Sequence, residues 1–319
     1  ATLNTTRLAM NFSSFANAVS QKHGEVSRGM FPGYDIHAIT NGVHASTWAH
    51  PAMRDLFDRH CERWRRDNAD LRLASRIPDE SIHAAHKAAK GELLEMLADR
   101  TDAKLNPDAL TVVFSRRVTE YKRPALLMSD IERLLAIHER FPLQIIYAGK
   151  SHPRDQRGKE TIATIVQASE KLKGTLPIVF YQDYGIESSK KLVSGADLWL
   201  NNPRPPLEAS GTSGMKAALN GVPSLSTMDG WWLEGWIEGV TGWAIGGEHD
   251  DQHYGDDRHG MDRAHAESLY SKLEQEVAPT FYNGAPRWAE IMRACIALNG
   301  SHFTTERMVR EYALRAYLA

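Results

Sequence analysis

Short apolar runs and longer helical stretches alternate along the chain from about residue 106 onward. The apolar runs are Leu110–Phe114, Leu143–Ala148, Ile178–Tyr181, Leu198–Leu200, Pro223–Leu225 and Trp243–Ile245. Because strands that alternate with helices form parallel sheets covered on both faces, this pattern predicts an α/β fold with a doubly wound parallel sheet. Ligands bind beyond the carboxyl ends of the strands in such folds, so residues that follow these runs are the candidates for function.

Several cations follow the first apolar run. The segment SRRVTEYKRP, Ser115–Pro124, contains Arg116, Arg117 and Lys122, with Arg123 directly after them. Fixed positive charges at this density are suited to holding phosphate groups against their mutual repulsion. The alternative is that some of these side chains, Arg123 among them, are solvated.

A glycine-rich segment follows the fourth apolar run and opens a predicted helix. It reads EASGTSGMKAALNG, from Glu208 to Gly221. Its small residues let the backbone approach a ligand, and its N–H and hydroxyl groups can hold an anion at a helix start. Lys216 beside such a turn either neutralises a phosphate or forms a Schiff base with pyridoxal 5'-phosphate (PLP). The alternative is an ordinary junction with Thr212 or Ser213 as the helix N-cap.

The first third of the chain has a different pattern. Residues from about 6 to 27 are expected to form one helix, because apolar residues recur there at helical spacing. We expect the apolar face of this helix to be exposed and the helix to be poorly anchored. A short strand is predicted at Ile36–Ile39, and helices from Pro51 to about Ala98. The arginines in this part are expected on a solvated helix face: Arg63, Arg65 and Arg66. We expect a boundary between residues 1–105, a domain tail plus helical connection, and residues 106–319, the phosphate-binding domain.

Composition excludes several classes of partner and site. The formal net charge of −2 gives no reason to expect nucleic acid or an anionic membrane, and no apolar run has membrane-spanning length. Two cysteines form no disulfide framework, which favours a reducing, cytoplasmic compartment. The start lacks a methionine and reads as mid-helix, so a fragment is expected. The aspartates at 250, 251, 256 and 257 are expected in a solvated loop, with no metal site, and the tryptophans between 231 and 243 in the core.

Three ordered motifs carry a resemblance to a known family. They are TNGVHASTW at Thr40–Trp48, the cation-rich Ser115–Pro124, and the stretch Glu208–Gly230. Together they resemble the α-glucan phosphorylases, the glycogen, starch and maltodextrin phosphorylase family, and GWWLEGW is similar to its shorter bacterial and archaeal branch. The resemblance implies the C-terminal Rossmann-like half of a two-domain glycosyltransferase (GT-B) architecture. It also implies reversible phosphorolysis of terminal α-1,4-glucosyl units to glucose 1-phosphate, with the PLP phosphate exchanging a proton with substrate phosphate.

The same resemblance implies a role for individual residues. Lys216 would carry PLP, and Arg117 and Lys122 would bind the substrate phosphate. The other cofactor-binding residues would be Thr212, Ser213, Arg116 and Tyr184. The sugar-binding residues would be Asn41, Tyr121, Glu208, Ser210 and Gly211.

The chain departs from the family pattern at several positions. Ser213 and Gly214 stand where members often have glycine and asparagine, and Arg116 replaces a lysine. His44 lies where the family often reads TPRRW, so the pattern assigns it no role. A loose alignment places Ser14 where many members have a histidine that contacts the sugar.

Two alternatives remain open at this point. The first is a sugar-nucleotide-dependent glucosyltransferase of the same architecture, which needs no PLP. The second is a non-catalytic fragment that binds PLP or glucan. We expect the isolated chain to be inactive, and its partners to be an α-1,4-glucan or maltodextrin, inorganic phosphate or glucose 1-phosphate, and a second copy in a homo-oligomer.

Overall fold

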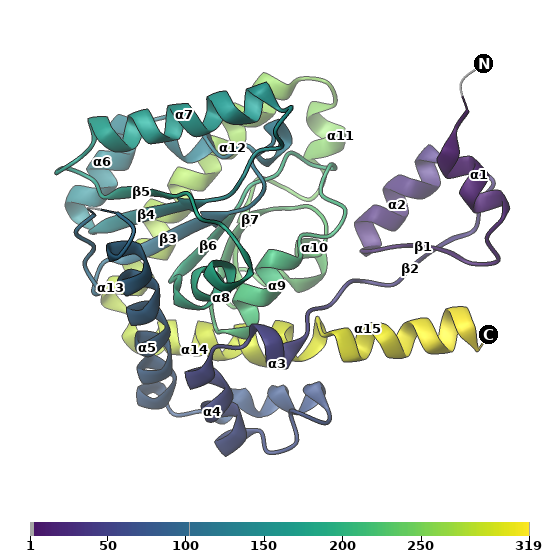
Figure 1. Ribbon diagram of the computed structural model, residues 1–319, viewed down its shortest axis with the longest axis horizontal. Helices are drawn as coiled ribbons and strands as arrows, with labels where there is room; N and C mark the ends of the chain where they lie inside the picture. Colours follow the sequence, from purple (N-terminus) through teal and green to yellow (C-terminus); the bar gives the residue numbers. More distant parts are fainter. Residues whose placement is uncertain (1–2, 102, 319) are drawn as a thin grey trace.

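The computed structural model describes residues 3–101 and 103–318. A six-stranded sheet forms its centre, with all strands parallel and in the order β5-β4-β3-β6-β7-β8 (Figure 1). The strands are β3 (Leu110–Ser115), β4 (Leu143–Ala148), β5 (Ile178–Tyr181), β6 (Leu198–Asn201), β7 (Ser224–Thr227) and β8 (Gly242–Ile245). Each predicted run is a strand whose ends lie within two residues of those predicted, so the predicted doubly wound α/β fold is confirmed.

The strand order reverses between β3 and β6. From β3 the chain adds β4 and then β5 on one side, whereas β6, β7 and β8 extend the sheet on the other. The two halves meet where Val112 pairs with Leu198. In doubly wound sheets, ligands bind in the crevice between loops that diverge at such a point, here the loops that leave β3 and β6.

Helices cover both faces of the sheet (Figure 1). One face carries α6 (Ile131–Arg140), α7 (Gln156–Lys171) and α12 (Arg258–Lys272). The other carries α5 (Asp79–Ala98), α8 (Ile186–Gly195) and α9 (Thr212–Leu219). Alternate residues of each strand supply the two cores, because successive side chains point to opposite faces. Other helices outside these two layers are α2 (Gln21–Met30), α4 (Pro51–His60), α14 (Ala285–Ala294) and α15 (Thr305–Tyr312).

The tryptophans after β7 lie in the larger core. Trp231, Trp232 and Trp243 are buried, and Trp236 is partly buried against the same cluster. The prediction of core packing for these residues is confirmed. Trp231 also lies directly under the glycine-rich turn, where it limits the space for side chains.

The N-terminal segment differs from its prediction. Instead of one helix from 6 to 27, the chain forms α1 (Thr5–Asn11), the strand β1 (Ala16–Ala18) and α2 (Gln21–Met30). β1 pairs with β2 (Ile36–Ala38) in a separate parallel sheet. The helical prediction was wrong because serine and asparagine between residues 13 and 20 favour turns and caps over helix interiors, and Ser20 caps α2.

The exposure of this segment is uneven. No side chain of α1 is buried, and Phe12 at its end is 85% exposed, as expected for an unanchored apolar face. By contrast, α2 is fastened to the main body, because the buried Lys22 pairs with Asp251 at 3.0 Å. The expectation of poor anchoring is therefore wrong for α2.

Residues 45–98 pack with the sheet rather than apart from it. Leu56 and Phe57 of α4 and Ile82 of α5 belong to the same core as β3 and β4. Near α4, Arg63 pairs with Asp70, as a partly solvated surface cluster would. The domain boundary after residue 105 stays a prediction.

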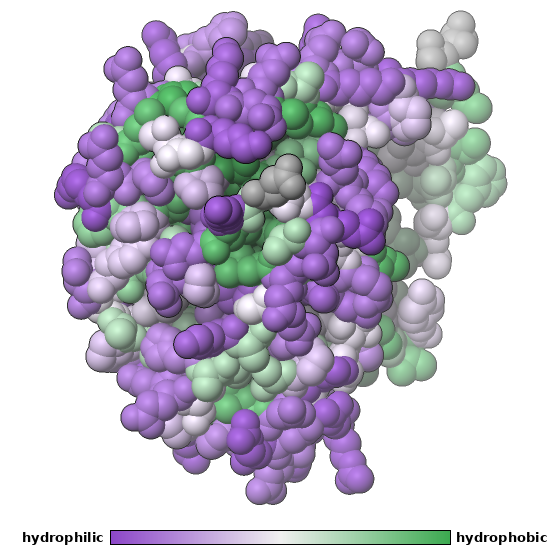
Figure 2. Space-filling view, turned by 60° about the vertical axis from the view of Figure 1, so that its left-hand side comes forward, coloured by the Kyte–Doolittle hydropathy of each residue, from purple (hydrophilic) through white to green (hydrophobic). Residues whose placement is uncertain are grey.

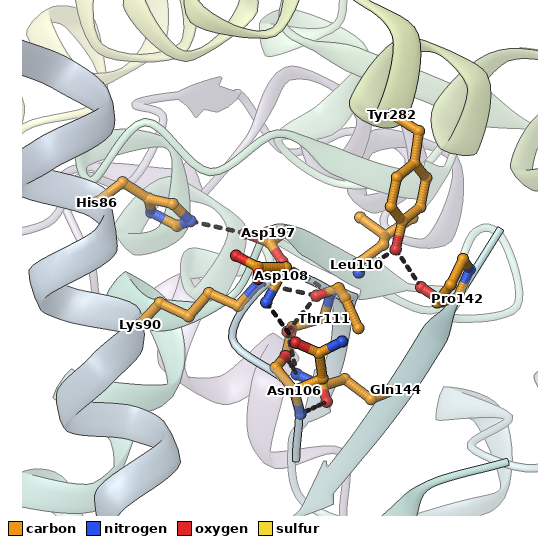
Figure 3. A network of polar contacts seen from close by, with 11 residues as sticks. His86, Lys90, Asn106, Asp108, Leu110, Thr111, Pro142, Gln144, Asp197 and Tyr282 are labelled. Carbon is orange, nitrogen blue, oxygen red and sulfur yellow. Dashed lines mark hydrogen bonds and ion pairs between the residues drawn. The ribbon is translucent and has the colours of Figure 1, made fainter. Parts of the chain in front are cut away.

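A buried polar network ties α5 to the amino-terminal ends of β3 and β6 (Figure 3). Asp197 accepts hydrogen bonds from Lys90 at 2.6 Å and from the backbone N–H of Thr111 at 2.8 Å, and it contacts His86 at 2.8 Å. Burial opposes ionisation of Asp197, but the charge of Lys90 and the contact with His86 hold its pKa below the usual value. This network fixes α5 at the end of the sheet opposite the candidate site.

The side of the molecule on the left in Figure 1 is mainly hydrophilic, with small hydrophobic patches between the polar side chains (Figure 2). Arg133 and Arg140 of α6 pair there with Glu267 and Glu274, each at 2.7 Å. Exposed pairs of this kind contribute little to stability. No helix in the described ranges combines the length and apolar character needed to cross a membrane.

Candidate functional site

Three loops converge beyond the carboxyl ends of the central strands. They follow β3 (residues 116–125), β6 (202–211) and β7 (228–231). Because β3, β6 and β7 are neighbours in the sheet, segments far apart in the sequence meet here. This is the crevice where the strand order reverses, and both motifs predicted to bind phosphate reach it.

Glu208 joins the two motifs. Its Oε2 accepts a hydrogen bond from Arg116 Nη2 at 2.8 Å and another from Lys122 Nζ, and all three side chains are buried. Burial opposes ionisation of Glu208, but the charges of Arg116 and Lys122 hold its pKa below the usual value. Burial, with the repulsion of Arg116, lowers the pKa of Lys122 to about 8. The site therefore holds two cations against one carboxylate.

The loop after β3 is shaped by backbone contacts and by Arg123. Gly149, just after β4, packs so closely that an added Cβ would lie 1.9 Å from the Arg116 carbonyl oxygen. Arg123 adopts φ 49°, and its guanidinium donates to the Asn202 carbonyl at 2.9 Å and to Asp262 at 2.8 Å. Arg123 is buried, so the alternative that placed it in solvent is wrong.

The glycine-rich turn leads into α9. Gly211 has φ 86°, a conformation that favours glycine, and it caps the helix that begins at Thr212. An added Cβ at Gly214 would lie 2.7 Å from the Trp231 ring, so the ring leaves no room for a side chain at this position.

Several buried polar atoms around this turn lack a partner among the described residues. They are Arg116 Nη1, Ser210 Oγ and Ser213 Oγ. Buried donors are nearly always satisfied in folded proteins, by protein, water or ligand. Their position around the crevice is what a site for a polar or anionic group requires.

Lys216 lies on α9 with its amine over an aromatic ring. Its Nζ is 3.6 Å from the centroid of the Trp48 ring, and burial lowers its pKa. No carboxylate of the described ranges compensates that desolvation. Tyr184 and Trp48 are each packed against the core on this face of the sheet. A lowered pKa lets Lys216 lose its proton more readily than an exposed lysine does, and the uncharged amine is the form that attacks an aldehyde carbonyl.

Sequence reasoning assigned no role to Trp48 or Asn220. Asn220 donates to the carbonyl oxygens of Trp48 at 2.9 Å and Lys216 at 2.8 Å, and it accepts from the His50 N–H at 2.8 Å. It thereby holds Trp48 against α9. Both residues lie within motifs that the sequence singled out, Trp48 at the end of TNGVHASTW and Asn220 near the end of EASGTSGMKAALNG. The motifs therefore pointed to these residues, but the sequence could not show that the two are in contact.

Other predicted residues occupy different positions. Tyr121 lies beneath Lys122, whose Nζ is 4.6 Å from its ring centroid. Arg117 is exposed, but its charge is close enough to help lower the pKa of Lys122. Asn41 is half-buried and belongs to the segment that follows β2, where its backbone carbonyl accepts from Arg307 at 3.0 Å. The structure does not bring its side chain into the Glu208 cluster.

His44 and Ser14, at two of the positions where the chain departs from the family pattern, lie at the surface. His44 is exposed and contacts the Thr47 hydroxyl at 2.7 Å within the short helix α3 (Ala45–Trp48). Ser14 is exposed in the turn between α1 and β1. Neither contacts the glycine-rich turn.

The aspartates after residue 249 make structural contacts. Asp250 contacts His265 at 2.8 Å, Asp251 pairs with Lys22, and Asp257 caps α12. Over residues 3–101 and 103–318, no group of three or more metal-ligating side chains is arranged to hold a metal ion.

Comparison with known proteins gives consistent matches. A family model described as carbohydrate phosphorylase matches residues 2–238. Maltodextrin phosphorylase from Thermococcus litoralis is 39% identical, over 98% of this chain and 40% of its own length. Glycogen phosphorylase from Aquifex aeolicus is 38% identical, over 98% of this chain and 49% of its own length. Glycogen phosphorylase from Mycobacterium tuberculosis is also 38% identical, over 99% of this chain and 40% of its own length. The chain thus spans less than half the length of each of these relatives.

Proposed function

Because this chain belongs to the carbohydrate phosphorylase family, we propose that it carries the cofactor and phosphate sites of an α-glucan phosphorylase. The reaction is the reversible phosphorolysis of terminal α-1,4-glucosyl units to glucose 1-phosphate. The observation that supports it best is the convergence of Arg116 and Lys122 on Glu208 beside the helix that bears Lys216. The names of the relatives, maltodextrin phosphorylase and glycogen phosphorylase, support an α-1,4-glucan or maltodextrin as the substrate class.

The residues present fit PLP. The desolvated amine of Lys216 would hold the cofactor, with the rings of Trp48 and Tyr184 beside it. Thr212 and Ser213 at the start of α9 would hold its phosphate, together with the unpartnered Nη1 of Arg116. When bound, PLP supplies a phosphate group that titrates near neutral pH and can exchange a proton with a second phosphate.

The cations of the β3 loop would hold that second phosphate. Lys122 reaches the site from a buried position and Arg117 from an exposed one, so Arg117 would close on the anion from the solvent side. Two phosphates side by side repel each other, and fixed positive charges offset that repulsion. Arg116 and Lys122 both bond Oε2 of Glu208, so its other carboxylate oxygen, which has no partner among the described residues, would be available to a sugar hydroxyl.

Five residues would form the sugar side of the crevice: Asn41, Tyr121, Glu208, Ser210 and Gly211. The unpartnered Ser210 hydroxyl and the Glu208 carboxylate supply hydrogen-bonding groups of the kind that sugar hydroxyls need. Asn41 would approach from the segment after β2. We place the protein in the cytoplasm, since both cysteines are free thiols, and a second copy remains a proposed partner.

The first experiment tests Lys216. The chain is incubated with PLP, reduced with borohydride and mapped by mass spectrometry. We expect one stable adduct, on Lys216, and its loss together with the imine absorbance in Lys216→Ala. Lys190→Ala is the control, because Lys190 lies on the adjacent α8 in an exposed pair with Glu187. An adduct that survives Lys216→Ala would refute the assignment, and a wild-type chain that takes up no PLP would favour the sugar-nucleotide alternative.

The second experiment tests the phosphate residues. Arg117→Ala should weaken phosphate binding at least tenfold, since a hydrogen bond to a charged group contributes roughly 1.5–3 kcal/mol. PLP loading should stay intact. Loss of PLP with unchanged phosphate affinity would show that the roles are reversed.

The third experiment concerns catalysis. We infer that this chain alone yields no measurable glucose 1-phosphate, because the reaction needs a closed, water-poor cleft. Adding the part of a relative that lies outside the aligned region should restore phosphorolysis. Full activity of the 319 residues alone would refute this inference.

A further inference from the structure

The sugar-binding loop Glu208–Gly211 is held on its inner side by the turn after β7. Asp229 Oδ2 accepts the backbone N–H of Glu208 at 2.8 Å, and the Ser210 carbonyl accepts the backbone N–H of Trp231 at 2.8 Å. Asp229 Oδ1 accepts from the Gly230 N–H at 2.8 Å, so each carboxylate oxygen has its own donor. These contacts hold the loop at two points, the N–H of Glu208 and the carbonyl of Ser210.

The turn after β7 packs so closely against the loop Glu208–Gly211 that there is no room for a side chain at Gly230. Gly230 has φ 58°, and an added Cβ there would lie 2.5 Å from the Ser210 carbonyl oxygen and 2.9 Å from that of Glu208. Asp229 is only 1% exposed. An asparagine in its place would offer one carbonyl oxygen, and its amide would face a donor. The geometry therefore requires a carboxyl group with two acceptors.

The outer side of the same loop is held by the N-terminal segment. The hydroxyl of Ser20 donates to the Ala209 carbonyl at 2.7 Å and accepts the His23 N–H at 3.0 Å. Ser20 is fully buried, although it precedes α2, which otherwise lies at the edge of the molecule. Nearby, the Gln21 N–H donates to Glu234 at 3.0 Å, which brings the segment against the β7–β8 connection.

We propose that Asp229 and Ser20 are positioning residues that hold the loop Glu208–Gly211 from its two sides and so place Glu208 against Arg116 and Lys122. The proposal rests on the proposed function, since it assigns this loop to the sugar and phosphate. Neither residue touches the substrate. Because Ser20 is the N-cap of α2, its bond to Ala209 also makes the conformation of the sugar-binding loop depend on how α2 packs against the rest of the molecule.

The test combines a local readout with a binding readout. Asp229→Asn is compared with Asp197→Asn, a matched control that removes a buried aspartate with backbone contacts at the opposite end of the same sheet. Amide hydrogen exchange is measured on a peptide that spans residues 205–212. Glucose 1-phosphate affinity is measured by calorimetry, and PLP loading of Lys216 by mass spectrometry.

We expect Asp229→Asn to accelerate exchange in that peptide and to weaken glucose 1-phosphate binding about tenfold, because the loop loses a buried acceptor that holds its backbone. PLP loading should be unchanged. Asp197→Asn should lower global stability without either local effect. Wild-type exchange and affinity in Asp229→Asn would overturn the proposal.

Ser20 gives a second, milder test in case Asp229→Asn does not fold. Ser20→Ala should accelerate exchange in the same peptide, and Ser20→Thr, which keeps the hydroxyl, should restore protection. Equal exchange in Ser20→Ala and wild type would overturn the outer half of the proposal. If the wild type bound neither PLP nor glucose 1-phosphate while the exchange effects remained, the proposed function would fail and the positioning of the loop would stand.

Discussion

Replacing Glu208 with glutamine removes the negative charge that Arg116 and Lys122 share, while the side chain keeps its size and one acceptor oxygen. Removing one partner of a buried ion pair destabilises folded proteins by about 3–5 kcal/mol, because the other charge stays buried without compensation. Arg116 is affected in full, since a guanidinium keeps its proton and its Nη1 already lacks a partner among the described residues.

Lys122 adds less, because it can lose its proton. Burial and Arg116 lower the pKa of Lys122 to about 8. This pKa lies about one unit above pH 7, so removal of the proton at pH 7 requires about 1.4 kcal/mol. We therefore expect Glu208→Gln to lower the free energy of unfolding by about 3–5 kcal/mol through Arg116, and by at most about 1.4 kcal/mol more through Lys122.

Urea denaturation with and without inorganic phosphate measures this effect. Phosphate brings negative charge to the same cations, so the variant should gain more from it than the wild type does; saturation at 100 times the dissociation constant corresponds to about 2.7 kcal/mol. Glu187→Gln on α8 is the control, because its pair with Lys190 is exposed. If Glu208→Gln unfolded at the wild-type urea concentration and gained nothing extra from phosphate, Glu208 would not be the counter-ion of this site.

Three further perturbations test other parts of the structure. Because the pKa of Lys122 is lowered to about 8, the ammonium is lost as pH rises through that value, and calorimetry should show phosphate affinity falling above pH 8; Lys122→Arg should abolish this fall. Asp197→Asn leaves a buried amine without its carboxylate and should lower the free energy of unfolding in urea by about 3–5 kcal/mol, with PLP loading of the folded fraction unchanged. Gly214→Ala should lower the free energy of unfolding by about 1–3 kcal/mol, because the new methyl group overpacks against Trp231. Gly91→Ala in α5, where a Cβ meets nothing within 4 Å, should raise it by about 0.5–1 kcal/mol. Thermal denaturation of both variants measures the two changes, and equal melting temperatures would contradict the prediction.

The sheet could be predicted because its strands are buried on both faces. Leu143–Ala148 is a continuous apolar run apart from Gln144, and such runs have few other structural solutions when helices separate them. The edge of the sheet that carries the site followed from the same pattern. The ion pairs of Glu208 did not, because they depend on β3 and β6 being neighbours, which is a property of the strand order.

The errors arose where local and long-range signals conflict. Apolar residues such as Phe12 and Phe15 have helical spacing, yet the Phe15 ring stacks on the His37 ring of β2 with 4.7 Å between centroids, so it packs on the small sheet. Serine is a favoured N-cap residue, so Ser20 indicated the start of a second helix, but the apolar spacing favoured one continuous helix instead. The contacts of Asn220 and Asp229 join loops from different parts of the fold, so residue type alone could not assign them.

The central position of β3 and β6 also determines when the site can form during synthesis. β3, β4 and β5 come first in the chain, and they complete one half of the sheet before Glu208 exists. Until then Arg116 and Lys122 are cations without their carboxylate, on an unpaired edge of β3. The complete site can therefore form only after β6 and the turn that carries Trp231 have docked on the finished half of the sheet that contains β3, β4 and β5.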